Sequence, residues 1–159
     1  MPTLHRLLST RAPAATVLIR LLVGWVFLSE GILKFLLPGE LGAGRFAHIG
    51  IPSPEVMGPF VGAVEIIAGA LVLIGLLTRP AAPALWINIT TALVSTKLPI
   101  LLGHAFWLFS LPRLPHYGFW SMAHEARTDL SMWLACLFLL LQGPGRLSLD
   151  ALLTRPTRP

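Results

Sequence analysis

The chain has 159 residues, of which 55% are hydrophobic and only 12% are charged, with a formal net charge of +5. A soluble domain carries about 25% charged residues to cover its surface, so the composition excludes a soluble globular enzyme. The basic residues are scattered singly, which argues against nucleic-acid binding. The apolar residues suffice for about four membrane-crossing helices, so we expect a single-domain, all-α, polytopic membrane protein whose surroundings are the lipid bilayer.

Four apolar stretches, each closed by proline, glycine or charge, predict a four-transmembrane-helix bundle. They cover about residues 15–37, 56–77, 82–102 and 121–142, and residues 143–159 form a tail. The fourth stretch is purely apolar only over residues 130–141, too short to cross a hydrocarbon core of about 30 Å. Its helix therefore has to begin earlier, and the outer half then carries His124, Glu125, Arg127 and Asp129.

Basic residues outside these stretches predict the orientation. Six would lie on one side and three on the other: Arg6, Arg11, Arg79, Arg146, Arg155 and Arg158, against Arg45, Arg113 and Arg127. By the positive-inside rule, both termini are expected in the cytoplasm. The basic segment 1–11 precedes an apolar stretch that Arg20 interrupts, and no small-residue cleavage site follows, so an uncleaved first span is expected.

The residue types restrict the available chemistry. A single cysteine, Cys136, excludes an internal disulfide, a cysteine metal cage and a thiol relay within one chain. A haem held by two histidines would need both on facing helices at one depth, whereas His104 and His116 belong to an expected loop. No flavin, nicotinamide or metal motif is recognisable, so no intrinsic cofactor or metal site is expected.

Six ionisable residues fall inside the predicted helices: Arg20, Glu30, Lys34, Glu65, Lys97 and Asp129. Such groups are costly in a membrane, and they normally face the bundle interior, pair with one another and mark a site. With a rise of 1.5 Å per residue, all except Arg20 lie roughly 5–14 Å below the outer helix ends. This layer, formed by Glu30, Lys34, Glu65, Lys97 and Asp129, is the candidate catalytic site.

Helical periodicity supports convergence of these groups on the packing faces. Spacings of three and four residues define one stripe on each of three helices: Arg20, Gly24, Phe27, Gly31 and Lys34 on the first, Gly58, Gly62, Glu65 and Gly69 on the second, and Asp129, Trp133 and Cys136 on the fourth. The third helix carries Thr90 above Lys97 and a neighbouring polar stripe of Asn88, Thr91 and Ser95. An alternative is that buried ion pairs only fix helix register, with Arg20 and Lys34 extending to the interfaces.

Several motifs, in both their residues and their order along the chain, resemble the DoxX family of small four-helix membrane proteins. They are residues 20–24, residues 27–34, Glu65 in a glycine-rich helix, residues 75–79 and residues 143–150. Residues 118–129 resemble one subgroup, while many other members have a single glutamate before the fourth helix, so either Glu125 or Asp129 is its counterpart. The resemblance implies a membrane component of a redox system, such as a subunit of thiosulfate:quinone oxidoreductase or of an oxidative-stress assembly, with an architecture similar to MauE-type maturation proteins.

The leading hypothesis is a multi-pass subunit of the bacterial inner (plasma) membrane that handles a membrane quinone, or a quinone-linked redox partner, in the outward half of the bundle. Electrons would be supplied by another membrane or periplasmic redox protein or by the quinol itself. Lys34 and Lys97 would donate hydrogen bonds, and Glu65 would relay protons with Glu30 or Asp129. The predicted quinone-binding residues are Phe27, Trp133 and Arg20. Two alternatives stay open: a non-catalytic scaffold or maturation factor that binds a periplasmic redox partner through loops 39–55 and 103–118, and a small proton-coupled transporter. The sequence is also compatible with a homo-oligomer.

Overall fold

The computed structural model describes residues 12–154, so the predictions for the basic N-terminal segment and for the last two arginines lie outside the described residues. Within the described range the regular structure is helical, with only an isolated bridge between Phe106 and Phe109, which confirms the all-α class. The elements are α2 (Thr16–Leu36), α3 (Ala43–Ile49), α4 (Pro54–Ile74), α5 (Thr78–Ala92), the π-helical turn η1 (Leu93–Lys97), α6 (Leu98–Leu102), α7 (Phe119–Gln142) and α8 (Leu149–Leu153).

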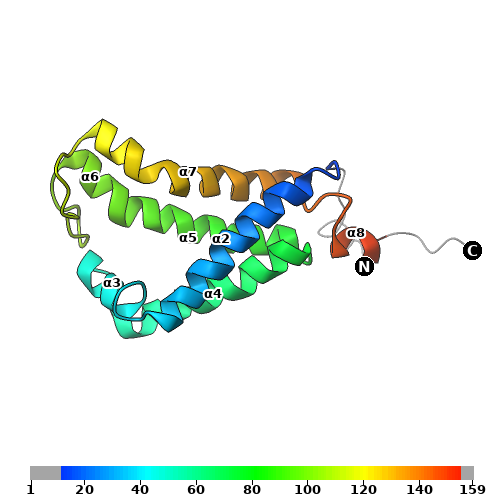
Figure 1. The fold of residues 1–159 in the computed structure, drawn as a ribbon, viewed down its shortest axis with the longest axis horizontal. Coiled ribbons are helices and arrows are strands. Elements are labelled where there is room, and N and C mark those ends of the chain that lie inside the picture. The colour runs from blue at the N-terminus through cyan, green and yellow to red at the C-terminus, as the bar shows by residue number, and fades with distance from the viewer. Residues whose placement is uncertain (1–11, 155–159) are drawn as a thin grey trace, which may run out of the picture.

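The long helices run between two ends of an elongated molecule (Figure 1). Helix α5 continues through η1 into α6 and runs beside α7, while α2 packs against α4. The α4–α5 turn and α8 lie at one end, called here the α8 end, and α3 lies at the opposite one, called the α3 end.

The helices fall close to the predicted stretches, with one difference at the α4–α5 turn. The sequence predicts that residues 78–81 lie between helices, but α5 already begins at Thr78. Pro80 is tolerated there because the first turn of a helix leaves its N–H groups without intrahelical acceptors. Gly75 ends α4 with φ 72°, a left-handed conformation that favours glycine.

Three helical segments in the described part of the chain are long and apolar enough to cross a membrane: Thr16–Leu36, Pro54–Ile74 and the continuous Thr78–Leu102. Helix α7, with 24 residues, is long enough to cross a membrane, but the charged side chains in its first half make it less apolar than these three segments.

Glycines bring α2 and α4 into close contact, as the small-residue stripes predicted. A Cβ atom on Gly24 would lie 2.8 Å from the backbone of Leu73, and one on Gly31 would lie 2.7 Å from the carbonyl oxygen of Gly62. Small residues at such faces let membrane helices approach until their backbones touch.

The apolar core joins α2, α4, α5 and α7. It is formed by Val23, Phe27, Ala68, Val72, Ala81, Ala82, Leu85, Ile89, Met132, Cys136 and Leu139. These positions occupy the middle of the bundle and the half toward the α8 end. Buried polar residues lie on both sides of this core: Glu65, Ser95 and Thr96 toward the α3 end, and Thr16, Arg20, Thr78, Ser148 and Asp150 toward the α8 end.

The segment after α7 folds back onto the α8 end. Asp150 is fully buried, and its carboxylate accepts hydrogen bonds from the backbone N–H groups of Leu77 (2.8 Å) and Thr78 (3.1 Å) at the start of α5. Ser148 caps α8 by accepting a hydrogen bond from the N–H of Ala151. The predicted tail is thus packed against the bundle over its described residues.

Candidate functional site

A cavity of about 540 Å³ lies in the half of the bundle toward the α3 end. Residues of α2, α3, α4, α5, η1 and α7 line it, and most of its surface is apolar. Phe27, Ile89 and Met132 belong both to the core and to the cavity wall, so they form its floor. An apolar space with a few convergent polar groups is typical of a small-molecule site.

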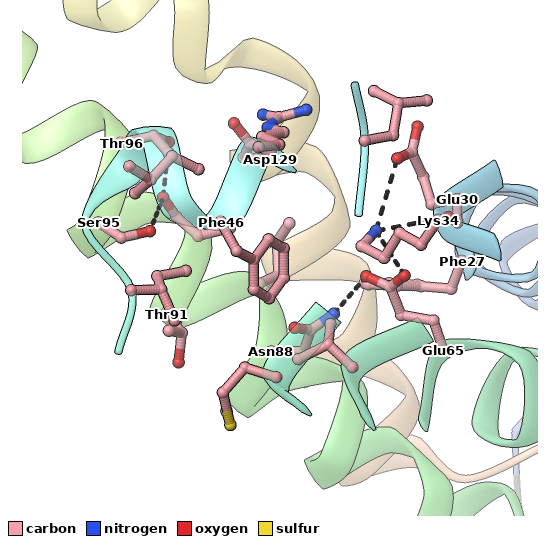
Figure 2. Close-up of a pocket in the computed structure, with 18 of the residues that line it drawn as sticks. Phe27, Glu30, Lys34, Phe46, Glu65, Asn88, Thr91, Ser95, Thr96 and Asp129 are labelled. Carbon is pink, nitrogen blue, oxygen red and sulfur yellow. Dashed lines mark hydrogen bonds and ion pairs between the residues drawn. The ribbon is translucent and has the colours of Figure 1, made fainter. Parts of the chain in front are cut away.

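Lys34 connects two carboxylates on one wall of this cavity (Figure 2). Its Nζ atom lies 2.6 Å from Oε2 of Glu65 and 3.8 Å from Oε2 of Glu30. The Nδ2 atom of Asn88 donates a 2.6 Å hydrogen bond to the other carboxylate oxygen of Glu65. Side chains from α2, α4 and α5 are therefore joined through Glu65.

Access to solvent differs sharply within this group. The side chains of Glu65 and Lys34 are 6% and 10% exposed, whereas that of Glu30 is 47% exposed. The ammonium group of Lys34 therefore lies between a buried carboxylate and an accessible one.

A second polar group lies on the other side of the cavity. Asp129 of α7 forms a 3.2 Å ion pair with Lys97, and the hydroxyl-bearing residues Thr91, Ser95 and Thr96 also line the space. Figure 2 shows Phe46 between the Glu30–Lys34–Glu65 group and Asp129, Ser95 and Thr96. The π-helical turn η1 contains an extra residue, so the side chains that follow it face a different direction from those of a continuous α-helix. Such turns are frequent at functional sites.

Helix α3 covers the cavity at the α3 end. Phe46 is buried and lines the space, and the carbonyl of Ile49 accepts a 2.8 Å hydrogen bond from the N–H of Ser110. This bond joins α3 to the loop between α6 and α7, which contributes Phe109 to the lining. Sequence reasoning missed these cover residues, because the glycine- and proline-rich segment around α3 has no clear period.

The structure unites most of the predicted site. Glu30, Lys34, Glu65, Asp129 and the predicted binding residue Phe27 line one cavity. Lys97 joins the site through its ion pair with Asp129.

Asn88 is absent from the predicted site, although the polar stripe of Asn88, Thr91 and Ser95 is visible in the sequence. All three residues line the cavity. Periodicity identifies the stripe, but contact between Asn88 and Glu65 depends on how α4 and α5 pair.

Trp133 lies away from the cavity lining. Its Nε1 atom donates a 3.0 Å hydrogen bond to Oγ1 of Thr90, and its ring centroid is 5.2 Å from that of Trp86. Trp133 therefore joins α7 to α5.

Arg20 lies at the α8 end, far along α2 from Lys34. Its guanidinium donates hydrogen bonds to the carbonyl oxygens of Pro144 (3.0 Å), Leu147 (2.6 Å) and Leu73 (3.3 Å). These bonds hold the segment after α7 against α2 and α4.

The fold and site define a helical, multi-pass membrane protein with a charged cavity between its helices. The chain belongs to the DoxX family, whose model matches residues 15–98. The match includes Glu30, Lys34, Glu65 and Lys97, and ends before α7.

Two relatives are similar over most of the chain. "Uncharacterized membrane protein Rv3486" of Mycobacterium tuberculosis is 52% identical over 154 residues, which cover 97% of this chain and 90% of the relative. "Putative oxidoreductase CatD" of Bacillus subtilis is 34% identical over 136 residues, which cover 85% of this chain and 84% of the relative. No solved structure matches the chain significantly.

Proposed function

We propose that the protein binds a membrane quinone in this cavity and acts as a subunit of a quinone-linked redox complex in the bacterial plasma membrane. The observation that carries the proposal is the Lys34–Glu65–Asn88 group on the wall of a largely apolar cavity of about 540 Å³. A quinone headgroup requires an apolar slot, hydrogen-bond donors for its oxygens and acids that exchange protons. All three are present on this cavity wall.

In this proposal four helices cross the membrane, with α7 as the fourth. Its charged half would be tolerated because Asp129 pairs with Lys97 and faces the cavity instead of lipid. The α8 end would face the cytoplasm, in accord with the larger number of basic residues assigned to that side. The cavity would then lie in the outward half of the bundle.

Each polar residue has a role that follows from its position. The ammonium of Lys34 and the amide of Asn88 are donors for a quinone oxygen, while Glu65 holds both of them in place. Glu30 is accessible to solvent and 3.8 Å from Lys34, so it would pass protons between the buried group and water. Bound quinone would supply two-electron redox chemistry, and a partner protein would exchange the electrons. The similarity to "Putative oxidoreductase CatD" of Bacillus subtilis supports this redox setting.

The test is quinone binding to the purified protein in lipid nanodiscs. Lys34→Met and Glu65→Gln each remove a charge-assisted hydrogen bond, worth about 1.5–3 kcal/mol, so we expect a roughly 10- to 100-fold weaker affinity. Glu55→Gln is the matched control, because Glu55 is an exposed carboxylate at the start of α4 outside the cavity lining. If the wild-type protein binds no quinone, or if both folded site variants bind as tightly as the wild type, the proposal is wrong.

A second candidate is a scaffold or maturation factor for a periplasmic redox partner. The loop between α6 and α7 favours it, because Trp107 is 80% exposed and Phe106 and Leu108 are exposed beside it. Replacing residues 106–108 with glycine and serine would abolish partner capture under this alternative. Quinone binding by the isolated protein would survive the same replacement.

A further inference from the structure

An apolar groove of about 300 Å³ lies between α4 and α5 on the α8 side of the cavity. Its lining includes Val64, Ala68 and Leu71 of α4, Ala81 and Ala84 of α5, and Leu77, which directly precedes α5. Alanines at three of these six positions leave room that larger side chains would fill. The groove is therefore a depression along a helix seam.

The groove continues the cavity on the same face of α4. Met57 and Val61 line the cavity, and Val64, Ala68 and Leu71 line the groove. These five positions recur at steps of four and three residues, the spacing that aligns side chains along one face of a helix.

Helix α5 presents the matching stripe in the opposite chain direction. Thr91 and Asn88 line the cavity, and Ala84, Ala81 and the preceding residue Leu77 line the groove, again at steps of three and four. The hydrogen bond between Asn88 and Glu65 marks the junction of the two spaces. From this junction the groove extends roughly 10–16 Å by helical rise.

Building on the proposed quinone function, we infer that this groove binds the hydrocarbon tail of a lipid-soluble quinone whose headgroup occupies the cavity. The substrate class is then a long-chain membrane quinone, not a small water-soluble one. A tail in the groove would contact only apolar side chains, and such packing is what stabilises association inside a membrane.

The opposite seam, between α2 and α7, is unsuited to a hydrocarbon tail. Glu30 of α2 is half-exposed there, and Thr128 and Asp129 of α7 line the same cavity. A tail leaving on that side would desolvate these polar groups without giving them hydrogen-bond partners. At the α3 end, Phe46 and the Ser110–Ile49 hydrogen bond cover the cavity.

Photo-crosslinking of the full-length protein in lipid nanodiscs tests the inference. The tail probe is a benzoquinone with a ten-carbon alkyl tail that ends in a diazirine, and the control probe is the same tail without the quinone headgroup. Mass spectrometry maps the labelled residues in the presence and absence of excess unlabelled decyl quinone. Thermal unfolding verifies that each variant is folded.

We expect the tail probe to label the groove-lining residues of α4 and α5, and unlabelled decyl quinone to suppress that labelling severalfold. Ala84→Phe fills the groove and should reduce the labelling severalfold, while Ala135→Phe should leave it unchanged. Ala135 is a matched control because it is also partly buried and packed against the core, but it lies on α7. Lys34→Met should reduce labelling by the tail probe without changing that by the headless probe.

The contrary results distinguish failure of the groove assignment from failure of the proposed function. If decyl quinone competes for labelling but the tail probe labels α2 and α7, or if Ala84→Phe has no effect, the groove assignment is wrong and the quinone site stands. The assignment is also wrong if the headless probe labels the groove equally and decyl quinone does not displace it. If decyl quinone suppresses labelling by the tail probe nowhere, the proposed function itself fails.

Discussion

The Nζ atom of Lys34 lies 2.6 Å from a carboxylate oxygen of Glu65, and both side chains are largely withdrawn from solvent. The pair joins the two helices whose glycines bring their backbones together, so its geometry is fixed by close packing of α2 against α4. Removing one partner of a buried pair is costly because the other charge is left uncompensated, whereas removing both charges is often nearly neutral.

Lys34→Met should therefore destabilise the protein by about 3–5 kcal/mol, while the double variant Lys34→Met/Glu65→Gln should recover most of that loss. Glutamine keeps an oxygen that accepts the hydrogen bond from Asn88. Equilibrium unfolding in detergent measures both values. A double variant that is less stable than Lys34→Met would contradict this account of the pair.

The Lys97–Asp129 pair should contribute less to the free energy of unfolding than the Lys34–Glu65 pair, because its side chains are 15% and 23% exposed. We expect Asp129→Asn to cost on the order of 1–2 kcal/mol, between the ranges for surface and buried pairs. The exchanged pair Lys97→Asp/Asp129→Lys should restore stability, as measured by the same unfolding assay. If the single variants fold and the exchanged pair is no more stable than they are, the two charges do not stabilise each other.

Close packing at Gly24 gives a third prediction. Gly24→Ala should destabilise the protein by about 1–3 kcal/mol, because the added methyl group would meet the backbone of Leu73 at 2.8 Å. Gly39→Ala is the control, since a Cβ atom there meets nothing within 4 Å, and a change within about 0.5 kcal/mol is expected. Thermal unfolding of the two variants compares them, and equal stability would argue against tight contact between α2 and α4.

Arg20→Lys should loosen the segment after α7. A lysine carries three donors on one nitrogen, so it does not reproduce the planar fork that reaches the carbonyl oxygens of Pro144, Leu147 and Leu73. Hydrogen exchange followed by mass spectrometry should show faster exchange in residues 145–154. Arg45→Lys, an exposed substitution near the α3 end, should leave that exchange unchanged. Unchanged exchange in Arg20→Lys would mean that other contacts hold the segment.

Depth and helical phase, both of which follow from residue spacing alone, identify much of the site. Glu30, Lys34, Glu65 and Asp129 share a level because helical rise is constant, and they lie on packing faces because charge is costly in lipid. Helical phase by itself also selects Arg20 and Trp133, which lie apart from the cavity. Arg20 is on the correct stripe of α2 but at the other end of the helix, and Trp133 is on the stripe of Asp129 but turned toward Thr90.

Composition and residue spacing are sufficient to give the class of protein and the level of the charged layer. The scarcity of charge excludes a soluble fold. The helical period of the polar positions indicates which helix faces point into the bundle and away from lipid. Three features become visible only in the folded chain: Lys34 pairs with Glu65, Asn88 completes the group, and α3 covers the cavity. Helical phase is a local property of the chain, whereas the order of helices, their distances and the fold of a glycine-rich loop depend on contacts between residues far apart in the sequence.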